Sequence, residues 1–337
     1  MQILEHGQAQ ERTLLFFPCT AEPVWAFADT ITLLSQRWHV FQVVYDGHQP
    51  EYPGDFTSVE QTVDEVISYL KSHGVSRLGG AYGCSMGGAC LTRMLALEEM
   101  PIDQAIIDGG ITPYQLPFLV RKLLLARDVL SFKMAANSRK VLEAAFPPER
   151  FTPAGHDPKK EYDAMEAYLK TFSDRTIRNV FWSANNYALP KRSAKIGAKI
   201  TYWYGDDEKK DRRRDIRFIK RYFPKARIHG IPKMAHAELV MVHPEKFCRY
   251  AEKFLTIFYQ SEDENSGQFT YFAFSPDTME TTYHLEFRYA EDLSDLQSWF
   301  EGNYAYWNAA AIAEDYDQAT MKNVIELFTT ENLSAAE

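Results

Sequence analysis

Short apolar runs alternate with amphipathic stretches along the first 110 residues of the chain. We predict strands at residues 1–5, 13–17, 39–45, 77–82 and 104–108. Those at 13–17, 39–45 and 77–82 are mainly apolar runs. Such runs are typical of strands covered on both faces of a sheet. The stretches between them have helical spacing and lie at residues 24–35, 59–73 and 89–97. Ser58 and Gln61 form a capping box before the second of these. Strands alternating with helices predict an α/β fold with a mostly parallel, doubly wound sheet.

The alternation stops at residue 111. From there to residue 194 the chain shows only helical patterns, at residues 116–134, 138–146, 160–172 and 176–186. This helical block is too long to be a connection between two strands, so we expect an inserted helical cap over residues 111–194. The apolar residues of this segment include Leu116, Phe118, Leu119, Leu123, Leu124, Phe181 and Trp182. We expect most of them to lie in the core of the cap and a few to face the site.

The alternation resumes after the helical block. Residues 199–204 and 226–231 are predicted strands, and residues 212–222 and 244–259 are predicted helices. These elements complete the sheet and its covering helices. The predicted core domain therefore comprises residues 1–110 and 195–260, interrupted by the cap.

The last part of the chain has a different composition. Residues 261–267 are rich in acidic and small polar residues and are expected to form a linker. Residues 268–274 and 282–289 are predicted strands, and two or three helices follow between residues 292 and 328, so residues 261–337 are expected to form a C-terminal α+β appendage of unknown role. From Glu262 onward there are 16 acidic and 2 basic residues, which gives −14, whereas the remainder carries +5. The opposite signs favour docking of one part on the other; the appendage could also cover a sheet edge, extend the cap or form a dimer surface in a homo-oligomer.

Composition limits the cellular locations and the classes of partner that we expect for this protein. The chain has 337 residues, 45% of them hydrophobic and 25% charged, as is ordinary for a folded protein. No apolar run is as long as a membrane span, and residues 1–12 lack the layout of a signal peptide, so we expect a cytoplasmic protein. Neither the acidic appendage nor the rest of the chain has the charge distribution of a nucleic-acid-binding protein. The cysteines have no metal-ligand spacing and are expected to be free, mostly buried thiols; they are Cys19, Cys84, Cys90 and Cys248.

Candidate chemistry centres on the sequence Gly-Cys-Ser-Met-Gly-Gly that begins at Gly83. It lies between a predicted strand and a predicted helix, which is the arrangement of a nucleophile elbow around Ser85. Glycines at 83 and 87 would let chain segments approach closely, and the helix would point its first amide, that of Met86, at whatever Ser85 attacks. A Gly-rich turn that merely caps a helix has the same pattern, so the interpretation depends on catalytic partners elsewhere.

Those partners are present in the expected order. A serine hydroxyl needs a base, and the base needs an acid that orients it. In this topology the acid follows a late strand and the histidine follows the last one. The acidic loop of Asp206, Asp207 and Glu208 follows the predicted strand at 199–204, and His236 follows the last predicted strand. An acidic group before a basic helix is also a normal N-terminal cap, so this alternative remains open. The other candidate histidines are interpreted as loop or helix-start residues; they are His48, His156 and His243.

With these motifs, residues 1 to about 260 resemble the α/β-hydrolase superfamily, specifically capped serine hydrolases with a G-x-S-M-G-G elbow, such as esterases and monoacylglycerol-lipase-like proteins. The resemblance implies Ser85 as nucleophile and His236 as base, with no metal and no organic cofactor. Family members usually show glycine, two variable residues and then the acid. This spacing favours Glu208, with Asp207 next and Asp206 last.

The oxyanion hole should combine the amide of Met86 with one from the loop after residues 13–17. In the resembled family this loop normally opens with His-Gly, whereas here it reads Pro18-Cys19-Thr20. Aligning the two puts Thr20, or alternatively Cys19, at the amide donor. The substituted loop still supplies an amide, because every residue except proline has one.

Three functions are compatible with these residues. The first is a serine hydrolase acting on a carboxylic ester or a similar acyl compound, with a small-molecule substrate that is partly apolar because the cap is apolar. The second is other chemistry of the same triad, namely thioester or carbon–carbon bond hydrolysis or acyl transfer. The third is a binding protein on a hydrolase scaffold, with the acidic, aromatic appendage as its interaction module.

Overall fold

The computed structural model describes residues 1–52, 54–114, 116–191, 196–255, 259–260, 268–273 and 283–288. The chain divides into two compact units, Met1–Cys248 and Arg249–Glu337. The first contains a seven-stranded sheet together with the elements that carry every candidate catalytic residue.

The seven strands run in the order β1-β3-β2-β4-β5-β6-β7. Only β1 is antiparallel to its neighbour, β3, and the other pairs are parallel. This architecture confirms the predicted fold class. The strands are β1 (Gln2–His6), β2 (Thr13–Phe17), β3 (His39–Val44), β4 (Leu78–Cys84), β5 (Ile102–Asp108), β6 (Lys199–Gly205) and β7 (Arg227–Ile231).

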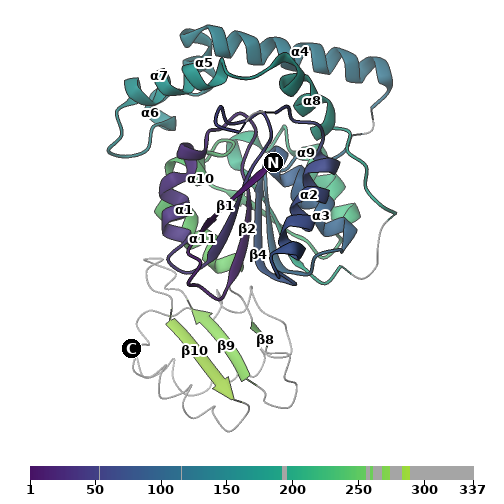
Figure 1. Cartoon of the computed structure of the whole chain (residues 1–337), viewed down its shortest axis with the longest axis vertical. Helices are drawn as coiled ribbons and strands as arrows, with labels where there is room; N and C mark the ends of the chain where they lie inside the picture. The colour runs from purple at the N-terminus through teal and green to yellow at the C-terminus, as the bar shows by residue number, and fades with distance from the viewer. Residues whose placement is uncertain are drawn as a thin grey trace. The chain divides into compact units, whose positions relative to one another are not determined.

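Successive side chains of the strands pack into two hydrophobic layers, one on each face of the sheet. Leu15 and Phe17 of β2 pack in one cluster with residues of α2 (Val59–Ser72), α3 (Met86–Leu97) and α9 (Arg213–Tyr222). Phe16 points the other way, with its ring 5.5 Å from that of Phe27 in η1 (Val24–Phe27). In Figure 1 the sheet accordingly lies between α2 and α3 on one side and α1 (Ala28–Leu34) with α10 (Glu238–Val242) on the other.

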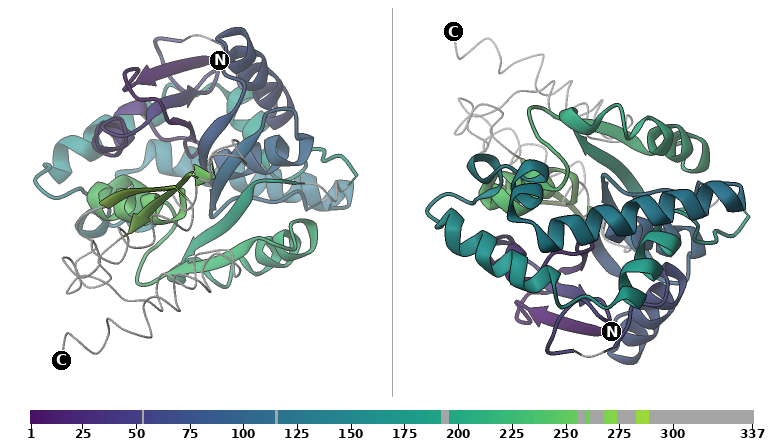
Figure 2. Two further views of the ribbon diagram at one scale, coloured as in Figure 1. Left: turned by 90° about the horizontal axis from the view of Figure 1, so that it is seen from below. Right: turned by 90° about the horizontal axis from the view of Figure 1, so that it is seen from above.

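Five helices lie between β5 and β6 in the sequence. They gather at one end of the core, and α4 extends across it when the unit is seen from above (Figures 1 and 2). They have a small core of their own, which includes Leu142, Tyr168 and Leu169. The five are α4 (Phe118–Asn137), α5 (Arg139–Ala145), α6 (Pro148–Phe151), α7 (Pro158–Leu169) and α8 (Asp174–Ala184).

Our expectation that most apolar residues of this segment are buried was wrong for α4. Phe118, Leu119 and Leu123 are 57%, 73% and 72% exposed. The reason is that α4 packs against the neighbouring helices through a narrow face and carries apolar residues around most of its circumference. Phe181 and Trp182 are partly buried, and Phe181 packs against both clusters.

Several element boundaries differ from the predictions. The helix expected at residues 24–35 is interrupted, because the 3-10 helix η1 precedes α1. The helix expected at 244–259 ends earlier, as α11 (Pro244–Leu255), and Tyr259 belongs to strand β8 (Tyr259–Gln260). The capping box is only half formed: the Ser58 hydroxyl accepts the amide of Gln61, but the Gln61 side chain donates to Glu65.

The second unit contains an antiparallel sheet of order β10-β9-β8. Strands β9 (Gln268–Ala273) and β10 (Tyr283–Arg288) correspond to the two strands predicted there. The expected linker at 261–267 and the expected helices between residues 292 and 328 lie outside the described residues. Within the described parts of the chain, no helix has the length and apolar character needed to cross a bilayer.

Candidate active site

Ser85 lies at the turn between β4 and α3. Its backbone has a φ of 56°, a left-handed conformation that is rare for a residue with a side chain, and α3 begins at the next residue, Met86. The amide of Ser85 donates to the carbonyl of Asp108 at the end of the neighbouring strand β5. This bond ties the turn to the sheet and leaves the serine at the carboxyl end of the parallel strands, where open α/β sheets bind their ligands.

The glycines around Ser85 allow close contact between backbones. A Cβ on Gly83 would lie 2.4 Å from the carbonyl oxygen of Gly87, and one on Gly87 would lie 2.3 Å from that of Phe17. A Cβ on Gly88 would lie 2.4 Å from the Cα of Gly110. Side chains at these positions would force strands and helix apart, as the motif predicts.

Glu208 is the member of the acidic group that lies against the histidine. Its Oε2 is 2.8 Å from Nδ1 of His236, while its Oε1 accepts the amide of Gly205. Asp207 instead pairs with Arg150 of α6 at 2.7 Å, and Asp206 lies beside Gly230 of β7. All three belong to the short 3-10 helix η2 (Asp206–Glu208), so the capping interpretation also describes part of their role.

Gly109 brings this pair next to the serine turn. A Cβ on Gly109 would lie 2.7 Å from Nδ1 of His236 and 3.0 Å from Oε1 of Glu208, so the pair packs directly on the bare backbone there. The preceding residue, Asp108, accepts the amide of Ser85. The serine turn and the histidine–glutamate pair therefore both contact the dipeptide Asp108–Gly109 at the end of β5.

Arg212 supports the glutamate from behind. Its Nε is 3.0 Å from Oε2 of Glu208, and one of its amino groups donates to the carbonyl of Gly109. Burial would raise the pKa of Glu208, but His236 and then Arg212 outweigh burial and hold that pKa below its ordinary value. Glu208 is thus kept ionised, which is the state needed to orient an imidazole and stabilise its cation. Arg212 was not predicted as a site residue, although it lies four residues after Glu208, a spacing at which side chains of consecutive turns can meet.

Glu238 fixes the loop that carries His236. Its carboxylate accepts the amide of Ala235 and the guanidinium of Arg150, both on Oε2. Ala237, next to the histidine, has a φ of 60°, so both neighbours of His236 are constrained. Since Arg150 also pairs with Asp207, one residue from α6 binds both the acidic loop and the histidine loop.

The candidate oxyanion loop lies beside this turn. A Cβ on Gly87 would also lie 2.6 Å from the carbonyl oxygen of Pro18, which shows how closely α3 approaches the loop. Thr20 is anchored by a 2.9 Å hydrogen bond between its hydroxyl and Nε2 of the buried His48. Burial lowers the pKa of His48 to about 4, so the ring is neutral at pH 7 and accepts from Thr20 while Nδ1 faces the carbonyl of Asp46. Cys19 is buried and free. A hydrogen bond with Cys84 lowers the pKa of its thiol, but burial together with the charges of Glu22 and Asp108 outweighs that bond and raises the pKa. The expected contribution of Cys19 is therefore its backbone amide.

A second buried acid near the serine was not predicted as a site residue. Asp108 is 5% exposed, and its Oδ2 accepts the hydroxyl of Tyr82 at 2.6 Å. Burial raises the pKa of Asp108 to about 6, against the hydrogen bond from Tyr82. The sequence offered only its position at a strand end. No cluster of three metal-ligating side chains occurs among residues with described positions.

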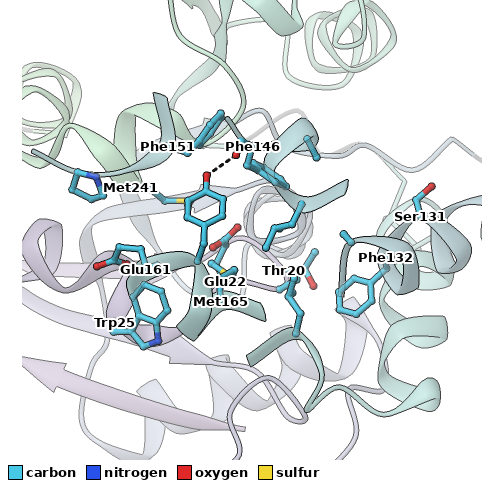
Figure 3. A pocket seen from close by; sticks show the side chains of 18 of the residues that line it. Thr20, Glu22, Trp25, Ser131, Phe132, Phe146, Phe151, Glu161, Met165 and Met241 are labelled. Carbon is cyan, nitrogen blue, oxygen red and sulfur yellow. Dashed lines mark hydrogen bonds between the residues drawn. The ribbon is translucent and has the colours of Figure 1, made fainter. Parts of the chain in front are cut away.

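A cavity of about 350 Å³ lies beside the candidate oxyanion loop, between the residues that follow β2 and the helices α4 to α8 (Figure 3). Thr20, Ala21 and Glu22 form part of its wall, and most of the remaining wall is apolar or aromatic. The cavity is large enough for a small organic molecule. Thr20 therefore belongs both to the candidate oxyanion loop and to a space in which a ligand could lie.

Comparisons with known proteins agree on the fold. No family model matches the sequence, and no curated protein matches it. Among solved structures, a putative alpha/beta hydrolase family protein from Desulfitobacterium hafniense matches with a TM-score of 0.60 at 17% identity, over 75% of this chain and 100% of that chain. An epoxide hydrolase from Vigna radiata matches with a TM-score of 0.58 at 15% identity, over 75% and 93%. A carboxylesterase structure from the thaumarchaeon Nitrososphaera gargenis matches with a TM-score of 0.56 at 15% identity, over 76% and 93%.

Proposed function

The chain has the α/β-hydrolase fold, and from this premise we propose that it is a serine hydrolase that cleaves a carboxylic ester or a similar acyl compound. The observation that carries the proposal is the 2.8 Å contact between His236 and Glu208, packed on Gly109 beside the turn of Ser85. An imidazole oriented by an ionised carboxylate, next to a serine on a strained turn, is the arrangement that activates a hydroxyl.

The proposed reaction proceeds through an acyl-enzyme. The Oγ of Ser85 attacks the carbonyl carbon while Nε2 of His236 takes the hydroxyl proton. The amide of Met86 and one from the Thr20 or Cys19 loop stabilise the negative charge on the carbonyl oxygen. His236 then gives its proton to the leaving group. In the second half the same imidazole deprotonates a water molecule that attacks the acyl carbon, and it returns that proton to Oγ of Ser85 as the acid leaves. Glu208 keeps Nδ1 protonated throughout and stabilises the imidazolium.

We further propose that residues 111–194 act as a cap domain over this site and that the substrate is partly apolar. The cavity beside Thr20 supports both, because helices α4, α5, α7 and α8 supply much of its wall and most of their contribution is carbon. The same triad is compatible with thioester or carbon–carbon bond hydrolysis and with acyl transfer, and the fold does not choose among these chemistries.

The test compares the wild type with Ser85→Ala and His236→Ala. We expect the wild type to react with a fluorophosphonate probe and to hydrolyse short and medium p-nitrophenyl esters. Each variant should lose at least about 10³-fold in turnover and lose labelling, while circular dichroism shows unchanged folding. A wild type that neither labels nor hydrolyses would contradict the proposal and favour a binding protein on a hydrolase scaffold. Product analysis on thioesters and carbon–carbon substrates would then rank the alternative chemistries of an active enzyme.

A further inference from the structure

Glu22 is a partly buried acidic residue in the wall of the cavity beside Thr20. It projects from the loop between β2 and η1 into the space enclosed by the helices (Figure 3). Its Oε2 is buried and has no hydrogen-bond partner in the described parts of the chain. Buried carboxylates are normally paired, because an isolated charge in a medium of low dielectric constant is costly. An unpaired one in the wall of a cavity therefore indicates a partner that comes with the ligand.

The charges of the cavity wall identify that partner as positive. The wall contains four acidic residues and, among the residues that have described positions, neither lysine nor arginine. Asp29 and Glu161 share His156, whose ring nitrogens lie 3.5 and 2.8 Å from their carboxylates. Asp128 pairs with the exposed Arg127 at 2.6 Å. Among these four, only Glu22 has neither an ion pair nor a hydrogen bond to its carboxylate within the described residues.

Aromatic rings make up much of the remaining wall. They come from η1, α4, α6, α7 and α8 and from the residue that follows α5, and they are Trp25, Phe132, Phe146, Phe151, Tyr162 and Phe181. Ring faces attract cations through their quadrupole, and rings together with a carboxylate are the usual surroundings of a bound ammonium group. The hydroxyl of Tyr162 donates to the carbonyl of Phe146, which fixes the position of that ring in the wall.

We propose that this cavity binds an ammonium group carried on an apolar body, with Glu22 as its ionic partner, and that the group belongs to the substrate of Ser85. The second clause rests on the proposed function: Thr20, two residues before Glu22, belongs both to the oxyanion loop and to the cavity wall. The chemical class is an ester or related acyl compound with an amine in its apolar part. Neutral ligands leave Glu22 without its counter-charge.

The titration of Glu22 supports this assignment. Burial raises its pKa to about 8, so without a ligand a proton takes the place of the cation. An ammonium ion favours the ionised form, so binding should release that proton and the affinity should rise between pH 6 and pH 8. The titratable groups that interact with Glu22 are the thiol of Cys19 and the hydroxyls of Tyr162 and Tyr168 of α7. Asp29, Asp128 and the His156–Glu161 pair lie around the same cavity. Burial raises the pKa of both tyrosines above this range, so they stay neutral.

The experiment measures binding directly, so it does not need catalysis. The probes are 4-phenylbutylamine, which is protonated up to about pH 10, and 4-phenylbutan-1-ol, a neutral molecule of the same shape that still forms hydrogen bonds. By calorimetry at pH 8 we expect the amine to bind the wild type at least 10-fold more tightly than the alcohol. In Glu22→Gln the affinities for the amine and the alcohol should differ by less than about 3-fold. The matched control Asp128→Asn removes a wall carboxylate that already has a partner, so it should keep the 10-fold preference for the amine over the alcohol.

Three results would overturn the proposal. Equal affinities of amine and alcohol for the wild type would make Glu22 a neutral hydrogen-bond donor. An unchanged preference in Glu22→Gln, with the variant shown to be folded by its melting temperature, would remove Glu22 as the anchor. Tight, Glu22-dependent binding of the amine that does not inhibit p-nitrophenyl butyrate hydrolysis would make the cavity an amine site separate from the substrate. If the protein hydrolyses no ester, the calorimetric comparison still tests the ammonium site, so the two proposals fail independently.

Discussion

Neighbouring acidic residues of equal charge have opposite surroundings at the candidate site. Glu208 is buried between His236 and Arg212, whereas the side chain of Asp207 is 52% exposed and pairs with Arg150. Only a carboxylate fixed against Nδ1 can hold the imidazole in the tautomer that receives a proton from serine. An exposed ion pair contributes at most about 1 kcal/mol.

Replacing each acid by its amide separates these roles. Glu208→Gln is expected to lower kcat for ester hydrolysis by about 10³- to 10⁴-fold, because the amide no longer selects the tautomer of His236. Asp207→Asn is expected to change kcat less than about 3-fold. Steady-state kinetics on a p-nitrophenyl ester measures both. Equal losses in the two variants, or a loss below a few-fold in Glu208→Gln, would contradict this assignment and direct attention to Asp108.

The sequence could predict which residue types meet at this site but not what supports them. Order along the chain and the G-x-S-x-G pattern indicated Ser85, the acidic loop and His236. The glycine–x–x–acid spacing ranked Glu208 first, and it is the acid that lies against His236. Arg212 and Glu22 belong to no motif. Arg212 contacts Glu208 at a local spacing of four residues, which is common to many surface ion pairs and does not by itself indicate a site. Glu22 is distinguished only by the missing hydrogen-bond partner of its Oε2 within the described residues.

At the scale of elements, hydrophobic spacing predicted the five inner strands of the sheet because each is a short run covered on both faces. The edge strands β1 and β7 are only partly buried. Hydrophobic spacing did not predict α6 and α10, which have only four and five residues and so show no helical period. Apolar spacing also could not tell buried from exposed positions in α4. That helix is apolar on most sides, and only its packing partners decide which side is covered.

The division of α4 and α5 into covered and uncovered faces predicts different costs of substitution. Leu142 of α5 is 3% exposed, so Leu142→Ala should lower the free energy of unfolding by about 2 to 5 kcal/mol. Leu119 of α4 is 73% exposed, so Leu119→Gln should change it by less than about 0.5 kcal/mol. Urea unfolding followed by tryptophan fluorescence measures both. A large loss in Leu119→Gln would mean that a partner covers this face of α4.

At the scale of the whole molecule, the chain joins two units of unlike charge. Every candidate catalytic residue and every residue of the cavity wall belongs to Met1–Cys248. Residues from Glu262 onward carry −14, and the rest of the chain carries +5. Since the first unit holds its own sheet, helices and site, its chemistry should not need the acidic residues at the end of the chain.

A chain shortened to residues 1–260 tests this independence. It keeps α11 whole, and its formal net charge changes from −9 to +5. We expect it to fold and to hydrolyse p-nitrophenyl esters with kcat within about 3-fold of the full chain, because no residue of the proposed triad, oxyanion loop or cavity is removed. KM for an amine-bearing ester should likewise stay unchanged, since its proposed anchor is Glu22. A folded but inactive shortened chain would show that the acidic region contributes to the site, and an insoluble one would show that it covers apolar surface of the first unit.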